Sequence, residues 1–249
     1  MKAFVETQAL LLWGDEGSTY EYDDFGNCTS YNDTVVNWER GGLLSSFGGN
    51  TYSYNAQGRR YMKTVNGAKT EYLYDGGKLL AETEYEDIVN AYGNTERKVI
   101  RERVYFYDAE GIIGFGSDTQ RYTYVKDAFD NVVSILYGNE EIAKYRYDAF
   151  GKCTVLNPDG TENTEADFIG NINPIRWKSM YCDVETGFYY IEGRYYSPEI
   201  RRYLSASSPE TMLDRATAVF GLNAYLITLD NCVNTLYNGY TIESGLELV

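Results

Sequence analysis

The chain has 249 residues, of which 43% are hydrophobic, so it can bury a sizeable core and is not expected to be disordered. Its 37 acidic and 22 basic residues give a net charge of −15, which argues against nucleic acid and anionic membrane surfaces as partners. Histidine is absent, which excludes Ser-His and Cys-His nucleophile pairs and zinc sites built on imidazole.

The amino terminus and the hydropathy pattern bear on export and membrane insertion. An apolar stretch at residues 9–13 resembles a signal peptide only faintly, because Glu6 precedes it and Asp15 follows it. No segment approaches the roughly 18 apolar residues of a membrane span. We therefore expect neither a signal peptide nor membrane insertion, and the sequence leaves the localisation open.

A tyrosine motif recurs six times between residues 20 and 151, in the form Tyr-x-Tyr-Asp-x-x-Gly with variations. Its copies begin at Tyr20, Tyr52, Tyr72, Tyr105, Tyr122 and Tyr145. Both tyrosines of a copy point the same way, because residues i and i+2 of a strand share a face. The aspartate or asparagine starts a turn, and the glycine accepts the positive φ that closes a hairpin. The motif predicts an all-β, mainly antiparallel fold of hairpins, with strand content well above average.

Three shorter patterns predict local structure. Residues 82–98 form an acidic-then-basic insertion with a turn predicted at Gly93-Asn94, and alternating apolar residues from Lys98 onward indicate a strand. The Gly-x-Gly at residues 114–116 lacks a third glycine, so we interpret it as a turn rather than a dinucleotide-binding loop. The Asn-Pro-Asp-Gly at residues 157–160 predicts a type I turn.

Beyond Tyr203 the pattern changes from strand to helix. Ser208 can cap a helix, Pro209 suits its first position, and Gly221 can end it. One apolar face at helical spacing would consist of Met212, Leu213, Ala216, Val219 and Phe220. We predict a short helix over residues 209–220 that packs onto the sheet.

The tyrosine copies resemble the YD repeats of the RHS family, large bacterial shell proteins related to Tc-toxin C components and the teneurin ectodomain. Residues 167–177 and 183–199 resemble the RHS repeat-associated core. The resemblance implies a curved, open sheet or spiral segment of YD-repeat hairpins over residues 1–155. It implies an RHS-associated core, or carboxy-terminal plug-like region, over residues 156–249. Six copies are too few to close a hollow shell, so we expect open sheet edges.

Many RHS proteins end their core with paired Asp-Pro-x-Gly motifs that cut the chain by aspartyl-protease chemistry, which needs two carboxylates sharing a proton. Here Cys232 stands where the family usually has proline, and residues 237–240, Tyr-Asn-Gly-Tyr, contain no aspartate. Asp214 is followed by Arg215 instead of proline. One carboxylate cannot form the dyad, so we interpret Asp214 as a helix-surface charge and expect no self-cleavage.

The four cysteines show no C-x-x-C spacing that would indicate a metal cage or a redox motif. They are Cys28, Cys153, Cys182 and Cys232. Free, mostly buried thiols are favoured over two disulfides, because an unpaired cysteine behaves as a small hydrophobe. The sequence leaves the disulfide state of all four open.

Each of two polar clusters has two interpretations, one as a binding site and one as ordinary surface structure. Asp23, Asp24 and Asn27 could hold calcium, but a solvated hairpin tip is favoured. Arg201-Arg202 could bind an anion, but pairing with the nearby Glu199 is favoured. Exposed tyrosines and tryptophans could also stack on sugar rings, although aromatic residues at strand spacing mostly serve packing.

The leading hypothesis is a non-enzymatic structural or interaction scaffold, a short or truncated RHS core of the type that encapsulates or presents a carboxy-terminal toxin. We expect the toxin itself to be missing, because only nine residues follow Tyr240. We expect no catalytic, cofactor-binding or metal-binding residue, and no cofactor. The expected partners are other protein chains at the open sheet edges, among them a toxin or immunity protein. The alternatives are a carbohydrate or cell-surface binding module and a self-cleaving aspartyl protease core.

Overall fold

The tyrosine-rich sequence folds almost wholly into β-strands. The computed structural model describes residues 19–39, 42–117, 119–208, 224–225 and 227, together with the backbone of 235–237 and 242–244. Strands account for 56% and helices for 4% of the residues that the structure describes. Average domains contain roughly 20–25% strand, so the prediction of an all-β fold with high strand content is confirmed.

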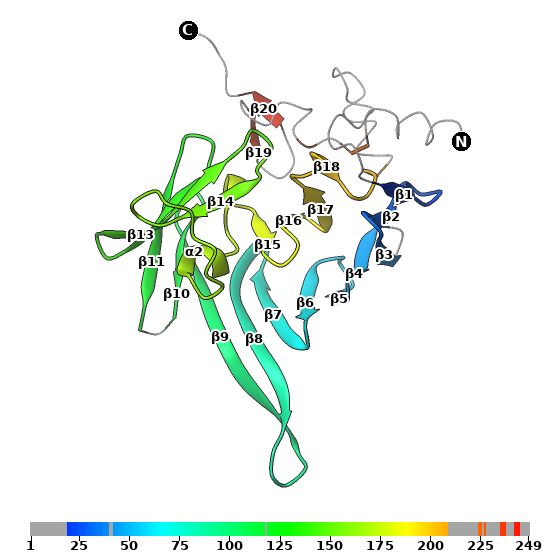
Figure 1. Cartoon of the computed structure of the whole chain (residues 1–249), viewed down its shortest axis with the longest axis horizontal. Coiled ribbons are helices and arrows are strands. Elements are labelled where there is room, and N and C mark those ends of the chain that lie inside the picture. The colour runs from blue at the N-terminus through cyan, green and yellow to red at the C-terminus, as the bar shows by residue number, and fades with distance from the viewer. Residues whose placement is uncertain are drawn as a thin grey trace.

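Among the described residues, fourteen strands form one antiparallel sheet in which each strand pairs with the next along the chain. The sheet curves strongly, so that one face is concave (Figure 1). Its strands are β1 (Tyr20–Tyr22), β2 (Cys28–Tyr31), β3 (Thr34–Glu39), β4 (Leu43–Phe47), β5 (Asn50–Tyr54), β6 (Arg60–Val65), β7 (Ala68–Asp75), β8 (Lys78–Val89), β9 (Thr95–Tyr107), β10 (Ile112–Gly116), β11 (Arg121–Lys126), β12 (Val132–Tyr137), β13 (Glu140–Tyr147) and β14 (Cys153–Leu156). The predicted curved, open sheet is confirmed.

The aspartate of the repeat makes the hairpin turn, because its side chain accepts backbone N–H groups two and four residues further on. Oδ1 of Asp148 accepts from the N–H groups of Phe150 and Lys152, both at 2.9 Å. Asp127 holds its turn in the same way. The glycine of the motif then takes a positive φ, which is +90° at Gly151. The turn chemistry predicted from the motif is confirmed.

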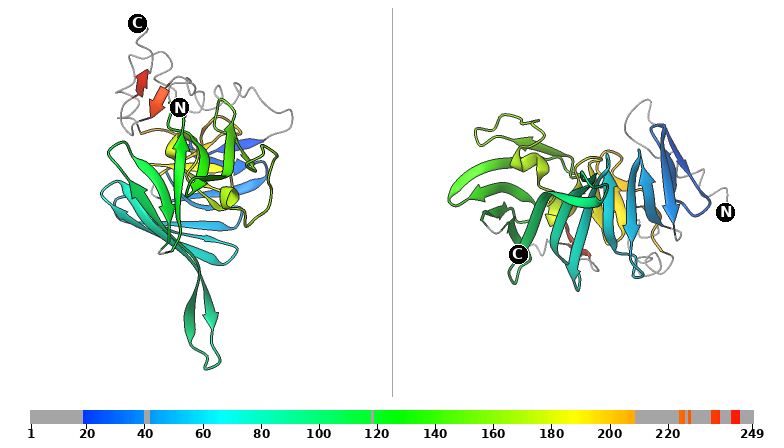
Figure 2. Two further views of the ribbon diagram at one scale, coloured as in Figure 1. Left: turned by 90° about the vertical axis from the view of Figure 1, so that its left-hand side faces the viewer. Right: turned by 90° about the horizontal axis from the view of Figure 1, so that it is seen from below.

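A second, smaller sheet lies on the concave side of the first (Figures 1 and 2). It consists of β15 (Tyr181–Asp183), β16 (Phe188–Ile191), β17 (Arg194–Ser197) and β18 (Arg202–Tyr203), and it follows helix α2 (Ile169–Ile172) and the 3-10 helix η2 (Trp177–Ser179). We call residues 163–207 the inner segment. The hydrophobic core lies between the inner segment and the large sheet. The strands β19 (Thr235–Tyr237) and β20 (Ile242–Ser244) pair with each other.

Tyrosine hydroxyls attach the inner segment to the large sheet. The hydroxyl oxygens of Tyr54 and Tyr195 lie 3.2 Å apart, and Tyr145 donates to the carbonyl oxygen of Gly170 at 2.8 Å. A buried hydroxyl has to find a partner within the protein, while the ring that carries it keeps its apolar contacts. The repeat tyrosines therefore serve both as core residues and as polar anchors.

Three local predictions have different outcomes. Residues 114–116 do not form a turn but end strand β10, where a Cβ on Gly114 would lie 2.2 Å from the carbonyl oxygen of Tyr122. Glycine is needed there because the backbone of the next strand comes close. The turn at residues 157–160 is confirmed, since its ends are joined by a 2.9 Å backbone hydrogen bond. The predicted helix over residues 209–220 lies outside the described residues.

The carboxy-terminal edge of the large sheet is partly covered. Leu156 of β14 pairs with Glu162, and the N–H of Asn163 donates to the carbonyl oxygen of Val155 at 2.9 Å. The predicted division into domains 1–155 and 156–249 stays a prediction. Within the part of the chain that the structure describes, no helix is both long enough and apolar enough to cross a membrane.

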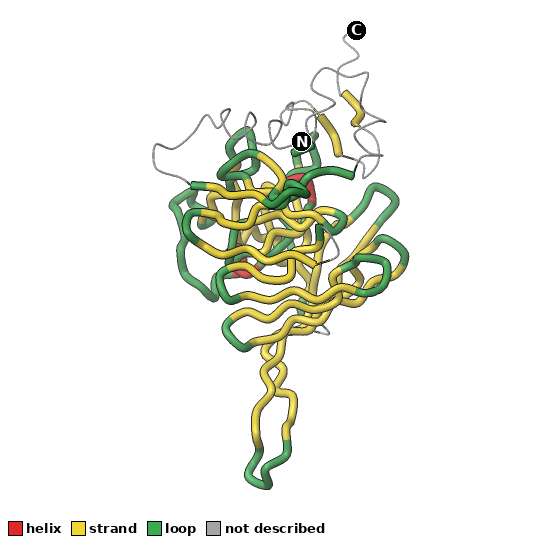
Figure 3. The backbone as a smooth tube through the Cα atoms, turned by 90° about the vertical axis from the view of Figure 1, so that its right-hand side faces the viewer, coloured by secondary structure: helices red, strands yellow, loops and turns green. Residues whose placement is uncertain are grey.

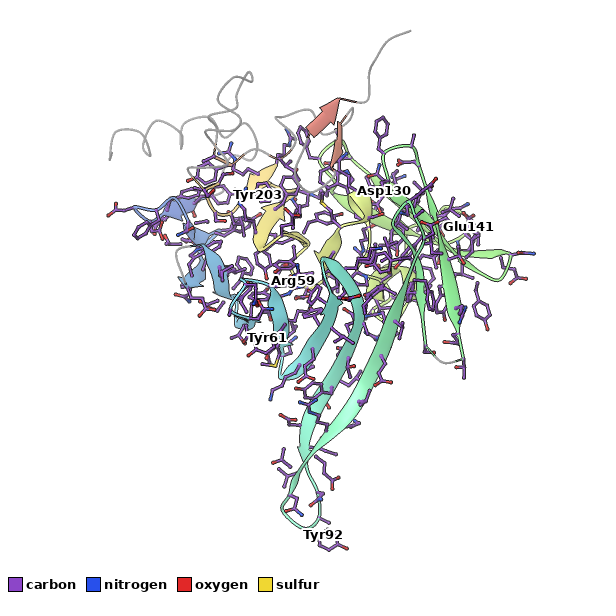
Figure 4. The ribbon with its side chains drawn as sticks, turned by 180° about the vertical axis from the view of Figure 1, so that it is seen from behind. Arg59, Tyr61, Tyr92, Asp130, Glu141 and Tyr203 are labelled. Carbon is purple, nitrogen blue, oxygen red and sulfur yellow. The ribbon has the colours of Figure 1, made fainter. Side chains whose placement is uncertain are left out.

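The longest strands form a hairpin that extends beyond the body of the protein (Figure 3). β8 has 12 residues and β9 has 13, and the N–H of Gly93 closes the turn between them by donating to the carbonyl oxygen of Asn90 at 3.0 Å. Tyr92 lies at the tip and is 90% exposed (Figure 4). The insertion predicted at residues 82–98 is the outer part of this hairpin, and its predicted turn is confirmed.

Candidate functional site

Two opposite charges are fully buried where the large sheet meets the inner segment. Arg60 comes from β6 and Asp183 from β15, and neither side chain is exposed to solvent. Nη1 of Arg60 lies 2.5 Å from Oδ2 of Asp183. A buried charge is stable only when it is paired and hydrogen-bonded, so this contact fixes the position of both strands.

Lys63 joins a second carboxylate to the pair. Its Nζ atom lies 2.9 Å from Oδ1 of Asp183 and 2.9 Å from both carboxylate oxygens of Glu185. Asp183 ends β15, and Glu185 lies in the turn that follows, which the N–H groups of Thr186 and Gly187 close on the carbonyl oxygen of Asp183. We call Arg60, Lys63, Asp183 and Glu185 the charged site.

An irregularity in β6 allows Arg60 and Lys63 to face the same way although they are three residues apart. Arg60 is opposite Tyr54 and Lys63 is opposite Tyr52, and the register shifts between them. The extra residue in β6 is Tyr61, which is 45% exposed. A β-bulge of this kind re-aims the side chains that follow it, and here it brings both cations to the concave face.

Tyrosine rings surround the buried guanidinium group. The Cζ atom of Arg60 lies 4.4 Å from the ring centre of Tyr190 and 4.8 Å from that of Tyr72. Its Nη1 atom also donates to the hydroxyl of Tyr195 at 2.9 Å. Attraction between a cation and an aromatic ring is strongest where water is excluded. The tyrosines therefore offset part of the cost of burying this charge.

A second ion pair continues the charged site toward the edge of the body. Glu82 of β8 is hydrogen-bonded to Arg103 of β9, and Arg103 also donates to the carbonyl oxygen of Ile172 at 2.7 Å. The hydroxyl of Tyr181 donates to Glu82 at 2.7 Å and lies 3.3 Å from the hydroxyl of Tyr72. A continuous polar network thus links the two ion pairs.

A cavity of about 400 Å³ opens beside this network. Its charged lining residues are Lys63, Glu82, Glu84, Glu86, Arg101, Arg103 and Glu185. Within the residues that the structure describes, no group of three or more Cys, Asp and Glu side chains is arranged to hold a metal ion. The cavity therefore combines carboxylates and cations in its lining.

The two carboxyl groups of the charged site have pKa values displaced in opposite directions. Burial alone would raise the pKa of Asp183, but Arg60 and Lys63 outweigh it and hold that pKa below its usual range. Burial and the nearby charge of Asp183 raise the pKa of Glu185 above its usual range. Carboxyl pairs separated in this way can act as acid and base.

These shifts predict opposite contributions to stability as the pH changes. Asp183 stabilises the fold above the pKa of an unfolded aspartate, about 3.9, and this contribution is lost as the pH falls through the lower folded value. The contribution of Glu185 is complete below about pH 4.3 and is lost as the pH rises through its higher folded value. We therefore expect Glu185→Gln to be at least as stable as the unsubstituted chain at neutral pH.

Urea denaturation at a series of pH values between about 3 and 8 checks this expectation. We expect the free energy of unfolding of Glu185→Gln to exceed that of the unsubstituted chain at neutral pH, and we expect this difference to shrink in acid. A variant that is destabilised at neutral pH and recovers in acid would mean that Glu185 is stabilised as a carboxylate.

The residues singled out from the sequence lie outside this site. Oδ1 of Asp23 accepts backbone N–H groups from Phe25 and Asn27, as the favoured hairpin-tip interpretation requires. The favoured pairing of Arg201-Arg202 with Glu199 is wrong, because Glu199 lies 2.7 Å from Nζ of Lys152.

Three of the four cysteines, Cys28, Cys153 and Cys182, are free thiols. Cys28 and Cys182 are buried and Cys153 is partly buried, as expected. Cys232 and Asp214 lie outside the described residues, and only the backbone of Tyr237 is described.

The charged site itself was missed. Asp183 and Glu185 lie at a turn rather than along one strand, and the bulge that aligns Arg60 with Lys63 leaves no mark in the residue pattern.

No protein-family model matches the chain. Curated relatives do match. The tRNA3(Ser)-specific nuclease WapA of Bacillus spizizenii is 30% identical over 223 residues, which cover 84% of this chain and 9% of that protein. The tRNA nuclease WapA of Bacillus subtilis is 30% identical over 224 residues, with the same coverage of both chains. The chain thus spans about 9% of the length of these relatives.

Among solved structures, TcdB2-TccC3-Cdc42 has a TM-score of 0.50 and 18% sequence identity, and the match covers 90% of this chain and 13% of that one. At this identity the likeness shows the fold alone. Interaction with other protein chains stays a prediction. Binding of carbohydrate or of a cell surface stays a prediction.

The relatives overturn the expectation of a non-enzymatic scaffold, because they are named as tRNA nucleases. The expectation that the chain has no part in an enzyme is wrong for the same reason. The absence of histidine excludes imidazole chemistry, but it leaves open acid and base catalysis by carboxyl, lysine and tyrosine groups.

Proposed function

Since the chain belongs to the RHS/YD-repeat family, we propose that it works as part of a bacterial toxin that cleaves tRNA. The observation that carries this proposal is the 30% identity to the WapA tRNA nucleases along 84% of the chain. Because the chain spans about 9% of those proteins, we assign the cleavage to the complete toxin. The protein partner that we propose for this segment is the nuclease part of the same toxin.

Within the toxin, the charged site holds the inner segment inside the curved sheet. Arg60 and Lys63 come from the sheet, Asp183 and Glu185 come from the inner segment, and each charge has a partner of opposite sign. Cations that are already paired offer little attraction to a phosphate, and the net charge of −15 acts against it as well. In this proposal the contacts with tRNA belong to another part of the toxin.

A second candidate function places chemistry at the charged site itself. Glu185 lines the cavity and Asp183 is fully buried next to it, and the pKa values of the two are displaced in opposite directions, which is typical of functional carboxyl pairs. Cleavage of RNA at a 2′-hydroxyl uses a base to accept its proton and an acid to protonate the leaving oxygen. In this candidate Glu185 is the acid, because it lines the cavity and its pKa is raised, whereas Asp183 is fully buried between Arg60 and Lys63, so the base is another group.

An assay of tRNA cleavage separates the two candidates. The chain alone and the toxin produced from the whole genetic locus are each incubated with total bacterial tRNA, and the products are resolved on denaturing gels. We expect the complete toxin to cut defined tRNAs and the chain alone to leave them intact, because its cations are paired.

The diagnostic variant is Glu185→Gln, and Glu140→Gln, an exposed position on β13, is its matched control. Cleavage that is lost in E185Q at an unchanged melting temperature, but kept in E140Q, would favour the second candidate. Intact tRNA in every sample would contradict both.

A further inference from the structure

The inner segment contains a buried arginine that lacks a carboxylate partner. Arg176 is 8% exposed, nearly as deeply buried as Arg103 and Arg60. Those two arginines form ion pairs with Glu82 and Asp183. Within the described part of the chain, no Asp or Glu side chain forms an ion pair with Arg176. A buried charge without a counterion is costly, so an anion beside Arg176 would be stabilised.

The guanidinium group of Arg176 is only partly satisfied by backbone carbonyl groups. Its Nε atom donates to the carbonyl oxygen of Asn173 at 3.0 Å, and Nη2 donates to those of Asn171 at 2.8 Å and Gly170 at 3.2 Å. Its Cζ atom lies 5.7 Å from the ring centre of Tyr145, which adds a weak attraction. Nη1 donates to no oxygen atom of the described residues, and it is not one of the polar atoms that the protein encloses without a partner. Nη1 is therefore accessible to a ligand.

Arg176 lines a cavity of about 430 Å³. The cavity lies between the first and the last strands of the large sheet, because Tyr31 of β2 and Cys153 of β14 line it together with the inner segment. Cys182 is also in the lining. Burial raises the pKa of Cys153 and raises that of Cys182 to about 12, and the nearby guanidinium of Arg176 does not outweigh it. Both thiols therefore stay neutral at physiological pH and do not balance the charge of Arg176.

Other hydrogen-bond donors lie around the same cavity. Lys152 is in the lining, where its Nζ atom lies 2.7 Å from Oε2 of Glu199. The two side chains are 62% and 47% exposed, and exposed ion pairs are weak, so Lys152 can turn from Glu199 to a bound anion. The hydroxyl groups of Thr186 and Ser197 belong to the lining as well. The donors are thus distributed over different sides of the cavity.

We propose that this cavity binds a small oxyanion of the phosphate or sulfate class, held by Nη1 of Arg176 with Lys152 at the rim. Such an anion supplies the counterion that the protein does not provide. A planar carboxylate binds arginine best through two parallel N–H groups, and here Nε and Nη2 are already occupied. A tetrahedral oxyanion, whose oxygen atoms point in several directions, fits one guanidinium nitrogen together with donors on other sides.

Isothermal titration calorimetry of the full chain with inorganic phosphate, in a buffer free of phosphate and sulfate, tests the proposal. We expect one phosphate per chain, and Arg176→Met should weaken binding more than about tenfold. Lys152→Gln should weaken it about two- to fivefold, and Glu199→Gln should strengthen it by a similar factor. The matched controls are Lys69→Gln and Asp87→Asn, which alter an exposed ion pair outside the cavity and should leave binding unchanged.

Circular dichroism establishes that each variant is folded. If R176M does not fold, K152Q and E199Q decide, because they leave every hydrogen bond of Arg176 in place. A chain that binds no phosphate overturns the proposal, as does an affinity that is the same in K152Q, E199Q and both controls. Sodium chloride is the second titrant, and binding of chloride as tight as that of phosphate would overturn the assignment to an oxyanion. These outcomes do not depend on cleavage of tRNA.

Discussion

Replacing Asp183 by asparagine is expected to lower the free energy of unfolding by about 3–5 kcal/mol. The substitution keeps the size of the side chain but leaves the buried guanidinium of Arg60 without its carboxylate partner. Lys63 loses one of its two partners at the same time. Neither cation can recover the lost interaction from water, because both lie in the interior. Chemical denaturation at neutral pH measures the effect.

Asp87→Asn provides the comparison for an exposed ion pair. Asp87 lies 2.6 Å from Lys69, but both side chains are about one third exposed to solvent, so the loss should be far smaller than in Asp183→Asn. The double variant Arg60→Met with Asp183→Leu removes both buried charges and should recover much of the stability lost in Asp183→Asn. Equal losses in Asp183→Asn and Asp87→Asn would show that the charged site does not hold the two layers together.

Gly151→Ala is expected to destabilise the protein by roughly 3 kcal/mol, from two separate causes. The φ of Gly151 is +90°, a conformation that costs a residue with a side chain about 1–2 kcal/mol. In addition, a Cβ at this position would lie 2.5 Å from Cδ2 of Trp177. The indole is 2% exposed and is packed beside Tyr189 and Tyr196, so it cannot move aside cheaply.

Gly58→Ala separates the two causes. Gly58 occupies the same position in another copy of the repeat and has a φ of +78°, but the nearest atom to a new Cβ is 3.8 Å away. Only the cost of the positive φ applies to Gly58, so Gly58→Ala should lower the free energy of unfolding by about 1–2 kcal/mol. If urea denaturation gives the same decrease in the free energy of unfolding for both variants, the indole of Trp177 can move aside and the inner segment is loosely packed around it.

The local structure of the large sheet could be predicted because each copy of the motif determines its own strand face and its own turn. The two tyrosines mark one strand face, and the aspartate and glycine fix the turn, as the contacts of Asp148 and Gly151 illustrate. None of these interactions depends on a distant part of the chain. The prediction failed where a glycine served a close approach instead of a turn, as Gly114 does.

The charged site could not be predicted because it joins residues that are far apart. Arg60 and Asp183 are 123 positions apart in the sequence, and nothing in either neighbourhood indicates the other. The register shift at Tyr61 decides which side chains face inward, and hydrophobic periodicity does not reveal a single extra residue. The functional hypothesis erred for another reason: the incomplete dyad and the missing toxin were interpreted as excluding an enzyme, whereas the relatives are named as tRNA nucleases.

The order of the elements along the chain has a consequence during synthesis. The hairpins of the large sheet involve contacts local in sequence, so they can form one after another as they leave the ribosome. Tyr72, however, needs residues 163–207 to cover it, and at about 5–20 residues per second these follow roughly 5–20 s later. During that interval the concave face is open to chaperones and proteases. A pause in translation before residue 163 lengthens this exposure, and rapid completion of the inner segment ends it.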